Sequence, residues 1–303
     1  MLFIFIYWWR DIMSIMQEIL NTKSQKIINE HVYQIQYGDH AVLVIKHPKC
    51  VAAISLYGAH LLFWQPTTEN LPVIWLSDQS HFKKTLPIRG GVPICWPWFS
   101  NAGTPMHGFA RICDWTLKSC TSTQDDVKCV FELTHSDETK QYWDADFNLT
   151  FDVNLSETCQ LMLANSGNFT ATAALHTYFG VNDIAEVNIT GLGANYTDKL
   201  STVNEPLIVG ELTFNQEVDR IYTQAESINN VIDHQRTIQI EHIHHSDVVT
   251  WNPWIEKTKS LNDLADSSYH DFVCVETARI NQPIKSTDHH DIAIGVKIAV
   301  KNR

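Results

Sequence analysis

Short runs of β-forming residues separated by turn residues fill most of this 303-residue chain, and they limit what it can fold into. The alternation of apolar and polar residues is clearest where Phe147, Leu149, Phe151, Val153 and Leu155 occupy every second position. Side chains two apart in a strand point to the same face, so such a strand buries one face and exposes the other. Hardly any stretch has the apolar spacing of an amphipathic helix of three turns. The pattern predicts an all-β protein built as an antiparallel sandwich or barrel.

The same pattern gives the expected position of each strand. By residue number the predicted strands are 32–37, 41–47, 51–56, 60–64, 73–76, 127–134, 146–155, 160–164, 171–179, 186–190, 237–243, 248–251, 272–278 and 292–300. Gly38 and Asp39, between the first two, predict a tight hairpin. Two short segments, 12–20 and 260–266, are predicted as helices, and neither is long enough to change the class.

No proline-, serine- or charge-rich linker divides the chain, so we expect one domain from residue 26 to residue 303. Residues 1–25 form an N-terminal extension, and the sequence does not decide whether all of it belongs to the native protein. Its first nine residues are strongly apolar but too short to span a bilayer, and they lack the leading positive charge and cleavage site of a signal peptide. We therefore prefer a loosely packed extension, or translation that starts at Met13 or Met16, to a membrane anchor.

Charge and cysteine content narrow the partners and the compartment. The formal net charge of −12 and the lack of a long basic run argue against a nucleic acid or a membrane surface as partner. A local group of arginines could still bind an anionic substrate. The seven cysteines are odd in number and contain no C-x-x-C pair, which favours reduced thiols over a disulfide framework or a zinc site. We expect a cytoplasmic monomer.

Residues 88–111 are unusually rich in groups that could carry chemistry. This stretch places Arg89, His107 and Arg111 among prolines, glycines and the aromatic residues Trp98 and Phe109. The prolines and glycines predict a rigid, irregular loop, because proline cannot donate to a sheet and glycine supplies unusual backbone angles. Flat aromatic walls beside fixed cations suit a polar ligand with an apolar face, such as a sugar. The alternative is a tryptophan-rich part of the core with surface arginines.

Four ionisable residues lie in strongly apolar or aromatic surroundings along the sequence: His107, His176, Asp219 and Glu276. Burying such groups is costly unless they have partners, so each is either a structural hydrogen-bonding residue or part of a site. Desolvation would favour the acid form of Glu276, which suits a general base that works near neutral pH.

Other candidates are weaker. His242 and His244 have the spacing of two metal ligands on one face of a strand, but no third ligand is near, and we expect solvated histidines at a strand end. Cys95 shares a loop with His107, and we expect a buried structural thiol there rather than a nucleophile. The common nucleotide-binding, hydrolase and zinc-protease motifs are absent, so we expect no cofactor and no metal.

Six segments of the chain carry a more specific signal. They are Arg-Gly-Gly-Val-Pro-Ile-Cys-Trp-Pro-Trp-Phe at 89–99, His-Gly-Phe-Ala-Arg at 107–111, Leu-His-Thr-Tyr-Phe at 175–179, Glu-Val-Asp-Arg-Ile-Tyr at 217–222, Trp-Asn-Pro-Trp at 251–254 and Phe-Val-Cys-Val-Glu at 272–276. Together, and in this order, they resemble the hexose-6-phosphate mutarotases, or glucose-6-phosphate 1-epimerases, which are relatives of aldose 1-epimerase. The likeness begins at about residue 41, and the N-terminal leader falls outside it.

The resemblance implies the antiparallel β-supersandwich of the galactose mutarotase type. It also implies an isomerase that interconverts the α and β anomers of an aldohexose 6-phosphate, with glucose 6-phosphate as first choice. His176 would be the general acid and Glu276 the general base, and no metal or cofactor is needed. Alternatives are an epimerase of unphosphorylated sugars and a non-catalytic sugar-phosphate-binding module.

The resemblance also implies how the substrate is held. His107 and Asp219 would bind the sugar, and Arg89 and Arg111 would favour a phosphorylated one. Trp98 and Phe109, both in the stretch 88–111, could stack on its apolar face.

Overall fold

The computed structural model describes residues 14–201, 211–234, 236–287, 289 and 291–302. The strands are β1 (Lys26–Ile27), β2 (Val32–Tyr37), β3 (His40–His47), β4 (Cys50–Ser55), β5 (His60–Pro66), β6 (Ile94–Cys95), β7 (Thr116–Ser122), β8 (Val127–Thr134), β9 (Asn148–Leu155), β10 (Cys159–Ser166), β11 (Phe169–Leu175), β12 (Tyr178–Gly180), β13 (Asn188–Thr190), β14 (Tyr196–Asp198), β15 (Glu211–Thr213), β16 (Val218–Tyr222), β17 (Ile228–Ile232), β18 (Arg236–Ile243), β19 (Asp247–Asn252), β20 (Phe272–Ser286) and β21 (Asp291–Asn302). The helices are α1 (Ile15–Asn21), α2 (Asp137–Lys140) and α3 (Trp254–Lys259), with 3₁₀ turns η1 (Ala110–Ile112), η2 (Ile184–Glu186) and η3 (Ser268–His270).

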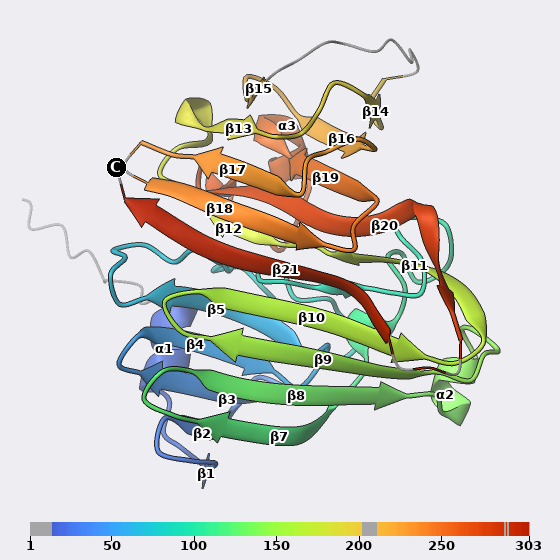
Figure 1. Ribbon diagram of the computed structural model, residues 1–303. Coiled ribbons are helices and arrows are strands. Elements are labelled where there is room, and N and C mark those ends of the chain that lie inside the picture. The colour runs from blue at the N-terminus through green and yellow to red at the C-terminus, as the bar shows by residue number, and fades with distance from the viewer. Residues whose placement is uncertain (1–13, 202–210, 235, 288, 290, 303) are drawn as a thin grey trace, which may run out of the picture.

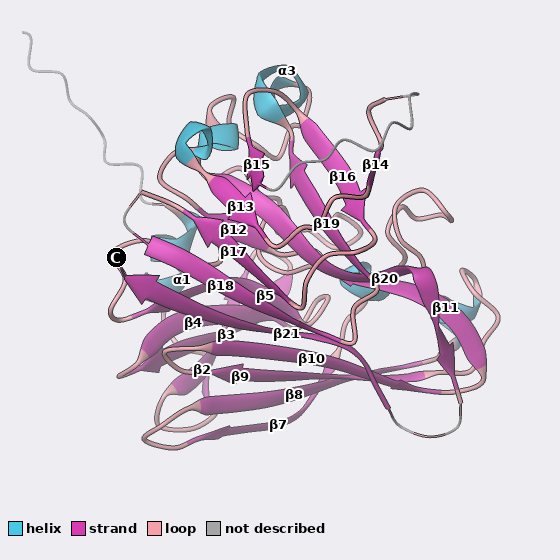
Figure 2. Cartoon of the chain, turned by 45° about the horizontal axis from the view of Figure 1, so that its top comes forward, coloured by secondary structure: helices cyan, strands magenta, loops and turns pink. Residues whose placement is uncertain are grey.

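The strands form three antiparallel sheets (Figure 1). One has the order β1-β2-β3-β4-β5, a second β15-β13-β17-β18-β21-β10-β9-β8-β7, and a third β14-β16-β19-β20-β11-β6, with β12 also paired to β20. Figure 2 shows β18, β21, β10, β9, β8 and β7 side by side in one twisted layer. The predicted all-β class and the antiparallel pairing are confirmed.

A large apolar cluster holds the sheets together. Residues from each of the three sheets contribute to it, including Trp64 on β5, Phe131 on β8 and Leu175 on β11, all with no exposed surface. Burial of each such side chain contributes about 1.5–3 kcal/mol to stability. The sheets are therefore fixed relative to one another by one shared core, which gives the site a rigid frame.

Helix α1 packs on the opposite face of the first sheet. Its Ile19 is completely buried in a second cluster with Ile35, Val42 and Phe63, and the Ser14 side chain caps its first turn. The helix predicted at 12–20 is thus found from Ile15, and residues 1–13 lie outside the described residues. Within the described part of the chain no helix has the length and apolar composition needed to cross a membrane.

Several local predictions differ from the structure. The hairpin at Gly38 is confirmed, since Tyr37 pairs with His40. The helix predicted at 260–266 is wrong: α3 ends at Lys259, the backbone N–H of the capping residue Ser260 donates to the Lys257 carbonyl, and turns follow. The predicted strand 73–76 forms only isolated bridges, and the predicted strand 171–179 is interrupted after Leu175.

Candidate active site

One face of the third sheet collects side chains from three neighbouring strands. Asp219 on β16 lies directly opposite Trp251 on β19, and Glu276 on β20 lies directly opposite Val249. Trp251 and Val249 are two residues apart and share a face, so all four side chains project from that face. Strand pairing alone thus brings Asp219 and Glu276 from distant parts of the sequence to one surface.

His176 reaches the same surface because the next strand is broken. β11 pairs with β20 up to Leu175, β12 resumes the pairing at Tyr178, and the two residues between them leave the regular ladder. The His176 backbone N–H donates instead to the Pro93 carbonyl at 3.0 Å. The His176 Nε2 then lies 3.4 Å from Glu276 Oε1. Tyr178 stacks on the imidazole with ring centroids 5.0 Å apart.

A second histidine is presented by the loop before η1. His107 has φ +66°, and at Gly108, with φ +74°, an added Cβ would lie 2.0 Å from the Trp96 carbonyl oxygen, so the turn requires glycine. The Ser100 N–H donates to His107 Nδ1 at 3.3 Å. That bond places the proton of a neutral ring on Nε2, which is then a donor for a ligand. The rings of His107 and His176 are 5.6 Å apart.

These side chains line a cavity of ≈ 260 Å³. Its lining residues are Arg89, Phe99, Ser100, Met106, His107, His176, Lys199, Asp219, Val249, Trp251, Lys257, Leu261 and Glu276. Five of the eight predicted site residues therefore lie together: Arg89, His107, His176, Asp219 and Glu276.

The predicted arginines have different surroundings. Arg89 lines the cavity, with Nε 3.1 Å from Asp263 Oδ2 and Nη1 donating to the Tyr178 hydroxyl at 3.0 Å. Arg111 is not among the lining residues, and its Nη2 donates to the Met106 carbonyl at 2.7 Å. The positive charge of Arg111 still lowers the pKa values of His107, His176 and Glu276.

The predicted stacking residues lie under the cavity rather than in its wall. Phe109 has no exposed surface and belongs to the large cluster, where it stacks with Tyr142. Trp98 packs against that cluster and donates from Nε1 to the Pro105 carbonyl at 2.7 Å. The aromatic residues that line the cavity are Phe99 and Trp251. The alternative reading as core thus fits Phe109 and Trp98.

Burial controls the protonation of the central pair. Desolvation, then the charge of Asp219, raises the pKa of Glu276 well above its usual range. Desolvation, then His107, Arg111 and Arg89, lowers the pKa of His176 well below its usual range. Desolvation also lowers the pKa of His107 to about 3. The neutral forms of both members of the pair are therefore favoured in the empty cavity, and Glu276 Oε2 has no hydrogen-bond partner within the described residues.

The weaker candidates have structural partners. His242 is not solvated as predicted: it is 4% exposed, and its ring bonds Thr277 Oγ1 and Asn229 Oδ1. Cys95 is buried, as predicted, and its Sγ lies 3.3 Å from His107 Nδ1. Within the described residues no group of three or more His, Cys, Asp or Glu side chains could hold a metal ion.

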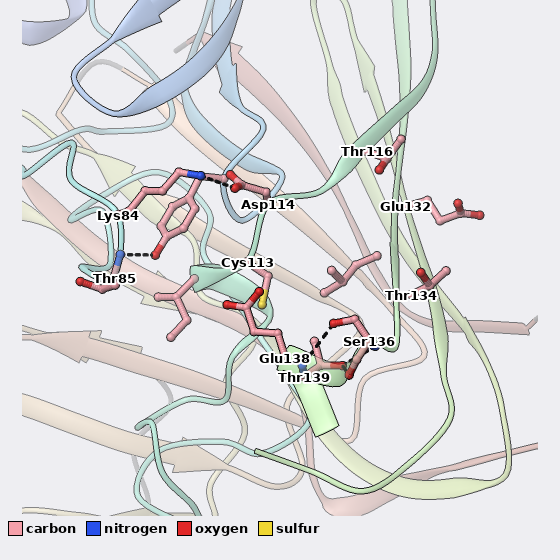
Figure 3. A pocket seen from close by; sticks show the side chains of 13 residues that line it. Lys84, Thr85, Cys113, Asp114, Thr116, Glu132, Thr134, Ser136, Glu138 and Thr139 are labelled. Atoms are coloured by element: carbon pink, nitrogen blue, oxygen red, sulfur yellow. Dashed lines mark hydrogen bonds and ion pairs between the residues drawn. The ribbon is translucent and has the colours of Figure 1, made fainter. Parts of the chain in front are cut away.

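A second cavity, of ≈ 340 Å³, lies beyond η1 (Figure 3). Its wall contains the ion pair of Lys84 with Asp114, 2.5 Å apart, and the carboxylates of Glu132 and Glu138. No histidine is among its lining residues. It therefore offers no counterpart to the buried acid–base pair of the first cavity.

Trp251, Tyr178, Lys199 and Lys257 are among the residues of the first cavity or its support that sequence reasoning missed. Trp251 lies in one of the six motifs and Tyr178 in another, so a signal was present for both. Lys199 and Lys257 lie outside every motif. Lys199 is positioned by pairing between β14 and β16, which lets its Nζ lie 3.0 Å from Asp219 Oδ2. No local pattern could have found either lysine.

Known proteins resemble this chain in sequence and in fold. The aldose 1-epimerase family model matches residues 41–291. A candidate glucose-6-phosphate 1-epimerase of Escherichia coli K12 is 42% identical over 268 residues, which cover 86% of this chain and 91% of that protein. Its counterpart in Haemophilus influenzae is 34% identical over 92% of this chain and 100% of that protein.

Solved structures agree with this relationship. The crystal structure of a candidate mutarotase from Salmonella typhimurium superposes with a TM-score of 0.91 at 37% identity, over 94% of this chain and 99% of that one. Galactose 1-epimerase from Lactobacillus acidophilus superposes with a TM-score of 0.65 at 11% identity, over 91% and 99% of the two chains, and shows the shared fold alone. The predicted galactose mutarotase-type fold is confirmed. By sequence and by structure, this chain belongs to the aldose 1-epimerase family of isomerases.

Proposed function

We propose that this protein interconverts the α and β anomers of an aldohexose 6-phosphate, with glucose 6-phosphate as the preferred substrate. The observation that carries the proposal is the buried His176–Glu276 pair, 3.4 Å apart on the wall of a sugar-sized cavity. Anomer exchange needs a base for the anomeric hydroxyl and an acid for the ring oxygen, and this pair supplies both. The named relatives from Escherichia coli and Haemophilus influenzae support the phosphorylated substrate.

In the proposed mechanism the anomeric hydroxyl binds at the carboxylate of Glu276, which lines the cavity. Glu276 takes the hydroxyl proton while His176 gives its proton to the ring oxygen. The bond between the anomeric carbon and the ring oxygen breaks, and the electron pair on the former hydroxyl oxygen forms the aldehyde. Rotation about the neighbouring carbon–carbon bond exposes the other face of the carbonyl, and the reverse transfers close the ring.

The remaining polar residues would orient the sugar. His107 offers Nε2–H to a hydroxyl, and Asp219 accepts from others while Lys199 balances its charge at 3.0 Å. Phe99 and Trp251 supply the apolar wall on which a pyranose face can rest.

The test is saturation-transfer NMR between the anomeric protons of glucose 6-phosphate, with and without the protein, and in parallel with glucose. We expect faster exchange for both sugars and a larger kcat/KM for the phosphate ester. Equal or greater efficiency with glucose would contradict the phosphorylated substrate. Saturable binding of the ester with no acceleration of exchange would indicate a binding module instead.

We further propose that the protein works as a cytoplasmic monomer. Support for the compartment comes from the seven cysteines, all of which are free thiols. A dimer mass in light scattering would contradict the monomer, and fractionation of the native cells tests the location.

A further inference from the structure

Three cationic side chains line the cavity, and they differ in how their charge is balanced. Arg89 is paired with Asp263 at 3.1 Å, and Lys199 is paired with Asp219 at 3.0 Å. For the ammonium group of Lys257 the described residues provide no ion pair and no hydrogen bond. A free cation facing a cavity is available to a ligand, whereas a paired one must first give up its partner.

The charge balance of the whole cavity leads to the same residue. The Glu276 carboxyl is held in its acid form, and the histidines are held neutral, by burial. With Asp219 and Asp263 each matched by a cation, the positive charge left without a partner among the lining residues is that of Lys257. Glu217 is the acidic neighbour whose ionisation Lys257 favours, and it is not among the lining residues.

Helix α3 holds Lys257 in place. The Asn252 Nδ2 donates to the carbonyls of Tyr269 and Phe272, both at 2.9 Å, and its Oδ1 accepts from the Trp254 N–H at 2.9 Å. This network fixes the start of α3 at Trp254, three residues after Trp251, which is part of the cavity wall. The flexible lysine stem therefore begins from a rigid base at the rim, while His176 and Glu276 lie deep in the cavity and are 8% and 1% exposed.

We infer that Lys257 is the residue that selects a phosphorylated sugar, by pairing with the 6-phosphate at the cavity rim; the inference rests on the proposed function. In an aldohexose the anomeric carbon and C6 lie at opposite ends of the ring. A sugar whose anomeric centre reaches the buried pair therefore leaves its 6-phosphate toward the rim. A dianion is stabilised there by a charge that no carboxylate of the cavity neutralises. Arg111, which bonds the Met106 carbonyl behind the loop, is not needed for this contact.

The test compares Lys257→Met with Lys259→Met. Both lysines are exposed on α3, but Lys259 pairs with Glu256 at 2.9 Å and does not line the cavity. We expect Lys257→Met to lower kcat/KM for glucose 6-phosphate at least about tenfold more than it lowers kcat/KM for glucose. This difference corresponds to about 1.4 kcal/mol. The change should arise chiefly from a higher KM. Lys257→Arg should keep the preference, and Lys259→Met should leave the ratio of the two efficiencies as it is in the wild type.

Equal losses with the two sugars, or no loss with either, in a Lys257→Met protein of normal melting temperature would overturn the inference. The proposed function fails separately, if the wild type accelerates neither exchange. In that case calorimetric titration with glucose 6-phosphate still decides the role of Lys257. Equal affinities of the wild type and Lys257→Met would then refute it, and a weaker affinity of the variant would support it.

Discussion

At the scale of single residues, the surroundings of His176 and Glu276 favour the products of the first proton transfers. Ring opening starts from a carboxylate and an imidazolium and ends with a carboxylic acid and a neutral imidazole. Those neutral forms are the ones that burial stabilises here. The carboxylate–imidazolium state and the carboxylic acid–imidazole state contain the same number of protons, so the two residues titrate as a coupled pair. The reactive carboxylate–imidazolium form therefore lies above the neutral pair in free energy, and ring opening returns the pair to its neutral form.

Removing either member should abolish most of the catalysis. We expect Glu276→Gln and His176→Asn each to slow anomer exchange by about 10²–10⁴, because each removes one general acid–base step. Glu256→Gln makes the same carboxyl-to-amide change on the exposed face of α3 and should have no effect. Saturation transfer measures the rates, and circular dichroism checks the fold. Wild-type exchange by Glu276→Gln would refute the assigned roles.

The pair also predicts a pH profile. When the His176–Glu276 pair binds a second proton, Glu276 can no longer act as a base. When the pair loses its single proton, His176 can no longer act as an acid. Since the pKa of His176 in the empty cavity is lowered from 6.5, the acid limb of kcat/KM should lie below pH 6.5. The pKa of Glu276 is raised well above 4.5, so the alkaline limb should lie well above pH 4.5. The rate should therefore have a plateau around neutral pH. Glucose is the substrate for this measurement, because the phosphate of the ester itself titrates near pH ~6. An acid limb at pH 6.5 or higher would contradict the neutral imidazole.

The chemistry-bearing residues of the site were predictable, and those that depend on tertiary pairing were not. His107, His176, Asp219 and Glu276 stood out because each is an ionisable group in apolar surroundings, and the structure brings all four to one cavity. Lys257 is an ordinary surface lysine in the sequence. Its position at the cavity depends on the Asn252 network, which joins segments about twenty residues apart in ways that no short pattern records.

At the scale of elements, Arg236 joins three parts of the fold at the start of β18. Its Nη1 donates to Glu69 Oε2 at 3.1 Å and to the Leu71 carbonyl at 3.0 Å, and its Nη2 donates to the carbonyls of Pro72 and Gly180 at 3.1 and 2.8 Å. β12 ends at that glycine, two residues after Tyr178. The arginine therefore ties the second sheet to the strand that supports His176.

Breaking this contact should destabilise the whole protein. Arg236→Met leaves the Glu69 carboxylate buried without its cation, and we expect a loss of about 3–5 kcal/mol in the free energy of unfolding. The double variant Arg236→Met, Glu69→Gln should recover part of the loss. Lys259→Met breaks an exposed pair and should cost less than about 1 kcal/mol. Urea denaturation measures the free energy of unfolding of all three variants. If Arg236→Met loses less stability than the control Lys259→Met, the Arg236–Glu69 pair does not stabilise the fold.

Strands with a regular apolar alternation were predictable, and strands without one were not. β9 alternates between buried and less buried residues and was predicted from the apolar residues Leu149, Phe151, Val153 and Leu155. β7 has no buried residue on either face, so it carries no apolar period and was missed. The break at His176 was missed for another reason. The apolar run continues through it, and only the pairing of β11 and β12 with one continuous β20 makes the gap visible.

At the scale of the molecule, the class could be predicted but the strand order could not. The second sheet joins β18 to β21 and β21 to β10, which are pairings between segments far apart in the sequence. Local alternation decides which face of a strand is buried and says nothing about its neighbour. The shared core, with residues from each of the three sheets, is what selects that order.

Buried histidines make the stability of the whole fold depend on pH. His60 is 1% exposed and bonds the Gly90 carbonyl, and desolvation lowers its pKa from 6.5 to about 4. Desolvation lowers that of His242 to about 3. Below pH 6.5 the unfolded chain therefore binds protons that the folded chain does not, so stability is complete above that pH and falls as the pH decreases toward the folded values.

Between pH 7 and pH 5 each of these two histidines should reduce the free energy of unfolding by about 2 kcal/mol. In His60→Gln, and separately in His242→Gln, the difference between the two pH values should shrink by that amount, even if each variant is less stable at pH 7. His81→Gln, at an exposed position, should leave the difference unchanged. Urea unfolding at both pH values provides the measurement. The same pH-dependent loss in all three variants and the wild type would mean that other groups, most directly the carboxylates, govern the acid sensitivity of the fold.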